Sequence, residues 1–268
     1  MKRARGSEEA GFPRETNMGA PGPIGKGGIE RQLRRQAGWL GESWLWLLRT
    51  RVLAGMPGRP KALDAGCGPG FVMDLLGKEM EVEGVDIDPD MVEMCRVKGL
   101  NVTKADAAAL PFEDGHFDIA YCSFLLLWAR DPVTVLREMR RVSKGWVLCL
   151  AEPDYGGRID YPPKLDGLRD LLAEGIRREG GDPFIGRKLR AIFRESGMDC
   201  EIGVHPGVWD VARLKEESAE EWRWVDSAVA RGGLDDRGLD EARGVWREAL
   251  GRGVLFQFNP IFYALARK

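Results

Sequence analysis

Short apolar runs alternate with helical patterns between residues 61 and 151, and this alternation constrains the fold more than any other feature of the chain. Apolar strands separated by amphipathic helices are typical of a parallel sheet covered on both faces. We therefore predict an α/β fold with three layers. The expected strands are residues 61–64, 82–86, 101–104, 117–122 and 146–151, and the expected helices are residues 71–78, 90–97 and 132–142.

The rest of the chain is predicted to be mostly helical around this sheet. Residues 1–27 are rich in Gly, Pro and charge without periodicity, which indicates a disordered tail. The expected divisions are a helical segment at 28–56, the sheet domain at 57–208, a helical insertion or cap at 209–252 and a final strand at 253–268. Tryptophans mark both helical parts, either as packing onto the sheet or as a lid and cap over a sizeable apolar or planar ligand.

A glycine-rich turn, Asp64-Ala65-Gly66-Cys67-Gly68-Pro69-Gly70, joins the first strand to its helix. Glycine permits the backbone angles of such a turn and lets a ligand approach the backbone closely. Asp86 ends the second strand, where an acid can accept both hydroxyls of a ribose. Asp106 follows the third strand and is placed to accept a hydrogen bond from an adenine amino group. Together these residues predict a nucleoside cofactor.

Two features argue against a dinucleotide-dependent dehydrogenase, which shares this type of sheet. Its fingerprint places a third glycine one position later, where this chain has Phe71. Asp64 also lies two residues before Gly66, and a carboxylate there would repel a pyrophosphate.

Four stretches resemble the class I S-adenosylmethionine (SAM)-dependent methyltransferases, in particular the ubiquinone and menaquinone biosynthesis branch. They are residues 63–70, 85–91, 106–118 and 136–142, and together they span about a third of the chain. The resemblance implies a Rossmann-like sheet of seven strands, mostly parallel, with an antiparallel last strand. It also implies SAM as the cofactor and transfer of its methyl group to a small-molecule acceptor.

The same resemblance implies roles for individual residues. Asp64, Gly66 and Gly68 would hold the methionine portion of SAM, Asp86 the ribose, and Ile87 one face of the adenine. Asp106 and Ala107 would contact the adenine edge, and Ser123 would lie near the reacting methyl group. The cofactor site as predicted comprises Asp64, Gly66, Cys67, Gly68, Gly70, Asp86, Ile87, Asp106, Ala107 and Ser123.

The acceptor site is predicted from residues 151–162, which leave the carboxyl end of the fifth strand, where open α/β sheets bind ligands. This segment mixes acids, tyrosines and an arginine around a Gly pair, which suits either substrate contact or a self-bonded structural loop. The catalytic candidates are Glu152, Asp154, Tyr155, Arg158 and His205. The expected substrate contacts are Trp44, Trp128, Tyr155 and Arg158.

Charge and cysteine usage narrow the remaining possibilities. The net charge of -2 argues against a nucleic-acid partner. No apolar run is long enough to span a membrane. Five scattered cysteines without a C-x-x-C pair, and only two histidines, predict no metal site. A cytoplasmic location is expected. A protein or RNA methyltransferase that uses the basic N-terminus, and a non-catalytic SAM-binding protein, remain as alternatives.

Overall fold

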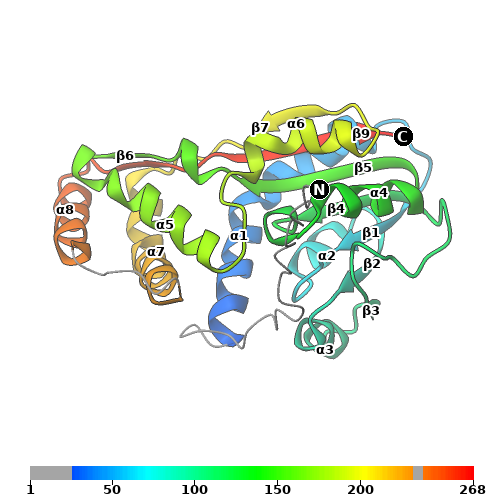
Figure 1. Ribbon diagram of the computed structural model, residues 1–268, viewed down its shortest axis with the longest axis horizontal. Coiled ribbons are helices and arrows are strands. Elements are labelled where there is room, and N and C mark those ends of the chain that lie inside the picture. Colours follow the sequence, from blue (N-terminus) through cyan, green and yellow to red (C-terminus); the bar gives the residue numbers. More distant parts are fainter. Residues whose placement is uncertain (1–25, 232–237) are drawn as a thin grey trace, which may run out of the picture.

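A seven-stranded sheet organises the protein, whose computed structural model describes residues 26–231 and 238–268 (Figure 1). The strands run in the order β3-β2-β1-β4-β5-β9-β7. Strand β9 pairs antiparallel with both β5 and β7, whereas the other neighbouring pairs are parallel. The predicted fold class is thus confirmed. The strands are β1 (Lys61–Ala65), β2 (Glu81–Asp86), β3 (Val102–Lys104), β4 (Phe117–Ser123), β5 (Ser143–Pro153), β7 (Glu201–Val204) and β9 (Ile261–Arg267).

Helices cover both faces of the sheet because each presents an apolar stripe to it. One face packs against α1 (Lys26–Leu47), the π-helical turn η1 (Leu48–Val52) and α2 (Phe71–Leu76). The other face packs against α4 (Pro132–Val142) and α6 (Ile185–Glu195). Helix α3 (Pro89–Val97) packs beside β3. In the described ranges, none of these helices is long and apolar enough to cross a membrane.

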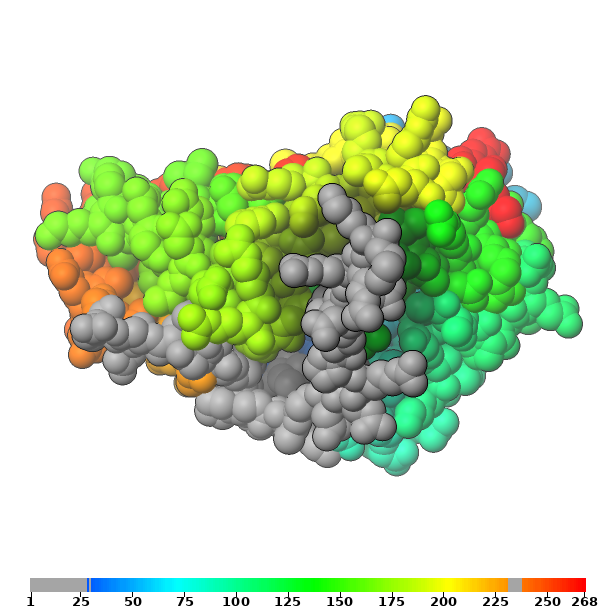
Figure 2. Space-filling view, in the orientation of Figure 1, coloured from blue at the N-terminus to red at the C-terminus, as the bar shows by residue number. Residues whose placement is uncertain are grey.

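A second apolar core lies at one end of the molecule, away from the sheet (Figure 1), and Figure 2 shows the outer surface of α5 and α8 at this end. It joins α5 (Gly167–Arg178), α7 (Val211–Arg231) and α8 (Leu239–Gly251), with Trp222 and Trp246 packed edge to face. A two-stranded ribbon, β6 (Ile159–Tyr161) with β8 (Phe256–Phe258), extends towards this lobe. We propose that the cap includes α5 and this ribbon, in addition to the predicted residues 209–252.

Two strand predictions differ from the structure. The final strand predicted within residues 253–268 is divided by Asn259-Pro260 into β8 and β9, because Pro260 has no N–H to donate to a ladder. Strand β5 begins at Ser143, directly after α4, and is longer than predicted. The predicted disordered tail, residues 1–27, lies almost wholly outside the described residues.

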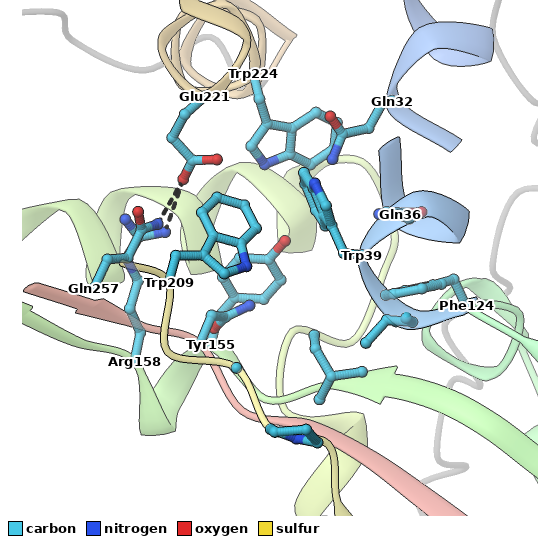
Figure 3. A pocket seen from close by; sticks show the side chains of 15 residues that line it. Gln32, Gln36, Trp39, Phe124, Tyr155, Arg158, Trp209, Glu221, Trp224 and Gln257 are labelled. Atoms are coloured by element: carbon cyan, nitrogen blue, oxygen red, sulfur yellow. Dashed lines mark hydrogen bonds and ion pairs between the residues drawn. The ribbon is translucent and has the colours of Figure 1, made fainter. Parts of the chain in front are cut away.

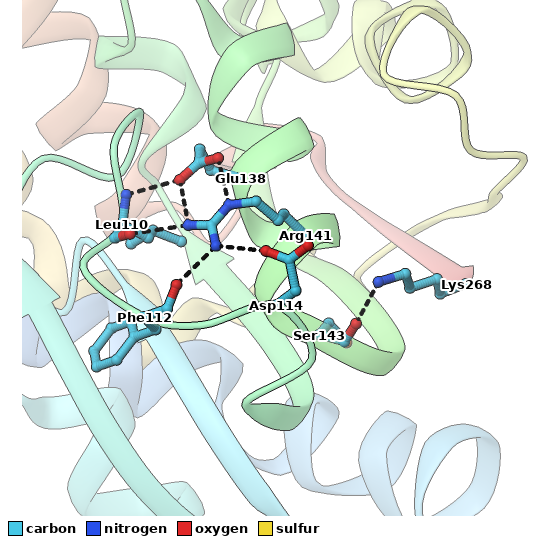
Figure 4. Close-up of polar contacts among 7 residues, drawn as sticks. All are labelled: Leu110, Phe112, Asp114, Glu138, Arg141, Ser143 and Lys268. Carbon is cyan, nitrogen blue, oxygen red and sulfur yellow. Dashed lines mark hydrogen bonds and ion pairs between the residues drawn. The ribbon is translucent and has the colours of Figure 1, made fainter.

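Arg141 on α4 holds the connection that leads from β3 into β4 (Figure 4). Its guanidinium donates to the carbonyl oxygens of Leu110 and Phe112 and pairs with Asp114 and Glu138. Glu138 in turn accepts the backbone N–H of Leu110 at 2.9 Å. This part of the family-like stretch is therefore structural, and it fixes the chain that follows Asp106.

Candidate active site

The glycine turn lies at the carboxyl end of β1, where the strand order of the sheet reverses between β1 and β4. Open α/β sheets bind their ligands at this point. Gly66 has a φ of 72° and Gly70 a φ of 81°, both in the left-handed region that side chains disfavour. A Cβ on Gly66 would lie 2.6 Å from Leu125 Cδ1, so the turn has no room for a side chain there.

A cavity of ≈ 40 Å³ opens beside this turn, and we name it the glycine-loop cavity. Helix α1 covers it from one side, while β1, the turn and the end of β4 line the other. Its predicted cofactor residues are Asp64, Gly66, Cys67, Gly68 and Ser123. Asp64 is 1% exposed, and its Oδ2 and the Ser123 Oγ have no hydrogen-bond partner among the described residues. Burial raises the pKa of Asp64 well above its usual range, and the nearby Tyr121 hydroxyl opposes that shift.

The remaining predicted cofactor residues lie along the neighbouring ends of β2 and β3. Asp86 accepts the backbone N–H of Gly68 at 2.8 Å and that of Asp88 at 2.9 Å, which ties the second strand to the glycine turn. Ile87 is 46% exposed, so its apolar side chain is open to a ligand. Asp106 is exposed and accepts the N–H of Ala108, and Ala105 donates to the Asp86 carbonyl oxygen.

A larger pocket of ≈ 100 Å³ lies between α1, the cap and the carboxyl end of β5, and we name it the aromatic pocket (Figure 3). Five aromatic side chains line it, from five separate parts of the chain: Trp39, Phe124, Tyr155, Trp209 and Trp224. Trp39 and Trp209 meet edge to face with ring centroids 4.8 Å apart. Burial raises the pKa of Tyr155 to about 12, so its phenol stays protonated at neutral pH.

One end of the aromatic pocket carries a buried polar cluster. Arg158 makes two hydrogen bonds to Asp160, at 2.7 and 3.1 Å, and a third to Glu221 Oε1 at 3.3 Å. The same Glu221 oxygen accepts the Gln257 side-chain N–H at 2.8 Å. Arg158, predicted as a substrate contact, is therefore engaged by two carboxylates within the protein, and its guanidinium fixes their positions.

Gln36 and Phe124 line both cavities, so the glycine-loop cavity and the aromatic pocket adjoin each other. Phe124 has a φ of 53°, which is uncommon for a residue with a side chain and costs about 1 kcal/mol or more. Its N–H donates to the Ala151 carbonyl oxygen at 2.8 Å, which holds this conformation. The backbone thus turns the Phe124 ring to the boundary between the two cavities.

Comparison with known proteins places this geometry in a family. Residues 63–149 match the methyltransferase domain family. An uncharacterized 37.1 kDa protein in transposon TN4556 of Streptomyces fradiae is 37% identical over 233 residues, which cover 81% of this chain and 65% of that protein. The chain therefore spans just under two thirds of that relative's length.

The demethylmenaquinone methyltransferase of Bacillus pumilus is 32% identical over 193 residues, which cover 62% of this chain and 82% of that enzyme. The chain belongs to the class I SAM-dependent methyltransferases. A crystal structure of a Bacillus halodurans protein assigned as a methyltransferase has the same fold, with a TM-score of 0.58 at 16% identity over 85% of this chain and 99% of that one. The protein is thus an enzyme whose cofactor is SAM.

The residues around the glycine turn fit this methyltransferase cofactor. SAM carries an ammonium group on its methionine portion, and the unpartnered carboxylate oxygen of Asp64 is an acceptor for such a donor. Asp86 already accepts two backbone N–H groups, and its carboxylate has further lone pairs for hydroxyl donors. Gly66 lines the cavity without a side chain and has a φ of 72°, a conformation that favours glycine.

Three of the predicted catalytic candidates, Glu152, Asp154 and His205, lie outside the aromatic pocket of this methyltransferase. Glu152 is fully buried, and its two oxygens accept the N–H groups of Leu126 and Leu127 at 2.7 and 3.2 Å. Asp154 is bound by Arg187 and accepts the N–H of Gly156. These two carboxylates stabilise loops, so they fit the structural alternative for this segment, whereas Tyr155 lines the pocket.

His205 is also enclosed by protein. Its Nε2 lies 2.7 Å from the Leu150 carbonyl oxygen, which can only accept, so Nε2 carries the proton. Nδ1 then accepts from the Ser43 hydroxyl at 2.8 Å. Burial lowers the pKa of His205, which favours this neutral form. The ring is a structural link between α1, β5 and the end of β7, and it does not line either cavity.

Two expected substrate contacts lie elsewhere. Trp44 is fully buried, donates to the Leu150 carbonyl oxygen and borders the glycine-loop cavity, not the aromatic pocket. Trp128 is 42% exposed, packs against Gly181 and lines neither cavity. The prediction for Trp44 came from the tryptophan-rich helix and that for Trp128 from the family resemblance, and neither gives the face of α1 or the direction of the chain after β4.

Sequence reasoning missed several residues of the aromatic pocket. Trp39, Trp209 and Trp224 belong to helical segments whose aromatic content was a signal for a lid and cap, but the pattern did not indicate which tryptophans face the ligand. Gln36, Phe124, Glu221 and Gln257 carried no signal at all. They acquire their role only because α1, α7 and β8 meet at the carboxyl end of β5.

Proposed function

We propose that this enzyme transfers the methyl group of SAM to a planar, largely apolar small molecule bound in the aromatic pocket. The observation that carries the proposal is that five aromatic side chains surround a pocket that adjoins the glycine-loop cavity through Gln36 and Phe124. Aromatic side chains favour flat apolar ligands, which they stack against or meet edge to face. A demethylmenaquinone methyltransferase among the relatives supports an acceptor of this kind.

We propose that Asp64, Gly66, Cys67, Gly68, Gly70 and Ser123 hold the methionine portion of the cofactor, Asp86 its ribose, and Ile87, Asp106 and Ala107 its adenine. When bound, SAM would supply a methyl group on a sulfonium: the acceptor atom would bond to that carbon as the carbon–sulfur bond breaks, with S-adenosylhomocysteine as the leaving group. The chain's contribution is orientation and exclusion of water, since the pocket is bounded by α1, the cap and β5. Tyr155, whose pKa is about 12, would donate a hydrogen bond to the acceptor and would not remove a proton from it.

The described part of the basic N-terminal stretch does not favour a macromolecular acceptor. Arg34 pairs with Glu30 and Arg35 with Glu217, so both guanidinium groups are engaged within the chain. A pocket enclosed by α1 and the cap suits a small molecule better than a nucleic-acid strand or a protein segment.

Methyl transfer from radiolabelled SAM tests this function. The full chain would be incubated with a panel of small planar aromatic compounds, and separately with bulk RNA and with protein. We expect label in the small-molecule fraction, and the Trp209→Ala variant should lose it while still binding S-adenosylhomocysteine. Label found only in RNA or protein, with none in the panel, would overturn the proposal.

A further inference from the structure

The polar end of the aromatic pocket presents hydrogen-bond acceptors without donors to satisfy them. Glu221 is 7% exposed and uses only Oε1, so its Oε2 has no hydrogen bond within the described residues. Gln257 is 9% exposed, and its Oε1 is buried without a partner. The orientation of this amide is fixed chemically, because a carboxylate can only accept and Nε2 is the atom that faces Glu221.

The same cluster carries an excess of negative charge. One guanidinium, on Arg158, faces two carboxylates, on Asp160 and Glu221, and it makes both of its short hydrogen bonds to Asp160. Arg158 and Glu221 are the charged side chains that line the aromatic pocket among the described residues, whereas Asp160 pairs with Arg158 without lining it. Glu221 therefore shares its one cationic partner with Asp160 and keeps the longer contact, so a ligand that brings a positive charge to its free oxygen would gain here.

The cluster lies at the opposite end of the pocket from the cofactor. In Figure 3, Glu221, Gln257 and Arg158 stand on one side, Gln36 and Phe124 on the other, and aromatic rings lie between them. Gln36 and Phe124 border the glycine-loop cavity, so the transferred methyl group enters from their side.

We propose that the acceptor carries a protonated amino group at the end remote from its methyl-accepting atom, bound by Glu221 Oε2 and Gln257 Oε1. The acceptor class is then a flat aromatic molecule with an ammonium group on a short arm. Glu221 acts as the specificity-determining residue, and molecules with a carboxylate or phosphate in that place are rejected. The inference rests on the proposed function, because it takes the aromatic pocket as the acceptor site.

Three compounds of nearly equal shape test the charge requirement in the full chain saturated with S-adenosylhomocysteine. Tyramine has an ammonium group on its arm, 4-propylphenol has a methyl group in the same place, and 3-(4-hydroxyphenyl)propanoate has a carboxylate. Calorimetry should give a dissociation constant for tyramine at least about tenfold lower than that for 4-propylphenol, as expected for a hydrogen bond between charged groups. The propanoate should bind more weakly than either. Equal binding of tyramine and 4-propylphenol, or tightest binding of the propanoate, would overturn the proposal.

The Glu221→Gln variant locates the effect. Glutamine can keep its Oε1 as acceptor for Arg158 and Gln257 while it removes the charge, so tyramine affinity should fall about tenfold and 4-propylphenol affinity should stay within about twofold. Glu216→Gln is the matched control, since it removes the same charge from an exposed position of α7 and should change neither. An equal loss of affinity for both compounds, or no loss for tyramine, contradicts the assignment of the ammonium site to Glu221. If Glu221→Gln does not fold, the order of the three dissociation constants in the wild-type protein decides the question.

These measurements separate this inference from the proposed function. If Trp209→Ala weakens 4-propylphenol binding while Glu221→Gln leaves tyramine unaffected, the aromatic pocket remains the acceptor site and only the ammonium group is excluded. If Trp209→Ala weakens none of the three compounds, the pocket is not the acceptor site and the proposed function fails with it.

Discussion

The glycine-loop cavity and the aromatic pocket adjoin each other, yet they are assembled in opposite ways. The first is built largely from one strand, one turn and one helix that follow each other along the chain, with α1 laid over them. The second takes its walls from α1, the end of β4, residues 155–158, residues 206–209, α7 and residues 257–261. A local cavity can be altered by one backbone change, whereas a composite pocket depends on the packing of several elements.

The largest effect is expected at Glu152, which holds the segment after β4 through the N–H groups of Leu126 and Leu127. Burial raises its pKa from 4.5 to about 8, so the folded protein retains a proton that the unfolded chain releases. Its contribution to stability is therefore complete below about pH 4.5 and is lost as the pH rises to about 8, by up to about 1.4 kcal/mol per pH unit.

Glu152→Gln should abolish this slope and, because glutamine offers one acceptor oxygen to two N–H groups, lower stability at acid pH by about 1–3 kcal/mol. Urea unfolding of both proteins at several pH values measures the difference. Parallel stability curves for the two proteins would show that folding does not shift the pKa of Glu152. The neighbouring Asp154→Asn variant serves as a control for loss of a buried carboxylate.

Gly66→Ala should break the glycine-loop cavity alone. A Cβ would meet Leu125 Cδ1 at 2.6 Å, and the φ of 72° disfavours any side chain, so affinity for S-adenosylhomocysteine should fall about 100-fold, or about 2.7 kcal/mol. Gly55→Ala is the matched control, since Gly55 also has a positive φ but a Cβ there would have no atom within 4 Å. Similar losses in both variants would mean that backbone strain, and not the cavity, determines the result.

Trp39→Ala should affect the aromatic pocket and leave cofactor binding intact. Removal of one indole wall is expected to weaken 4-propylphenol binding about 30-fold, or about 2 kcal/mol, because large aromatic side chains dominate such sites. Trp46, on the same helix, is 58% exposed, so Trp46→Ala controls for loss of a tryptophan. A parallel loss of S-adenosylhomocysteine affinity in Trp39→Ala would show that the two cavities are not separable.

The smallest effect concerns the pH dependence of cofactor binding through Asp64. Burial raises its pKa, and a cationic cofactor favours the ionised carboxylate, so SAM affinity should fall as the pH decreases, by up to about tenfold per pH unit below that pKa. Asp64→Asn should bind more weakly and show a flat profile. If SAM affinity depends on pH as steeply in Asp64→Asn as in the wild type, another titrating group causes the dependence, and Asp86 is the first to test.

The difference between the two cavities also explains how far the sequence could be interpreted. The strand and helix pattern from residue 61 to residue 151 predicted the order of elements closely, because apolar periodicity reports burial directly. The glycine turn and the acidic residues at the strand ends predicted the cofactor, because these features follow local backbone rules. The division of the last strand at Pro260, the pairing of β6 with β8 and the place of α5 in the cap depend on contacts between distant segments.

Glu152, Asp154 and His205 show the limit at the level of single residues. Each has chemistry that suits catalysis, and the sequence placed them near the correct edge of the sheet, but their partners are Leu126, Arg187 and Ser43, all remote in the chain. Which polar group faces a ligand depends on which of its neighbours already satisfies it.

The sequence by itself determined the sheet, the glycine turn and the SAM cofactor, because one contiguous strand, turn and helix contains the geometry that binds a nucleoside. Tertiary structure alone decided the aromatic pocket, which we propose as the acceptor site. Trp39, Trp209, Trp224 and Glu221 converge only when α1 and α7 meet near the end of β5, and the aromatic rings with the oxygens of Glu221 and Gln257, not any motif, carry the acceptor that we propose.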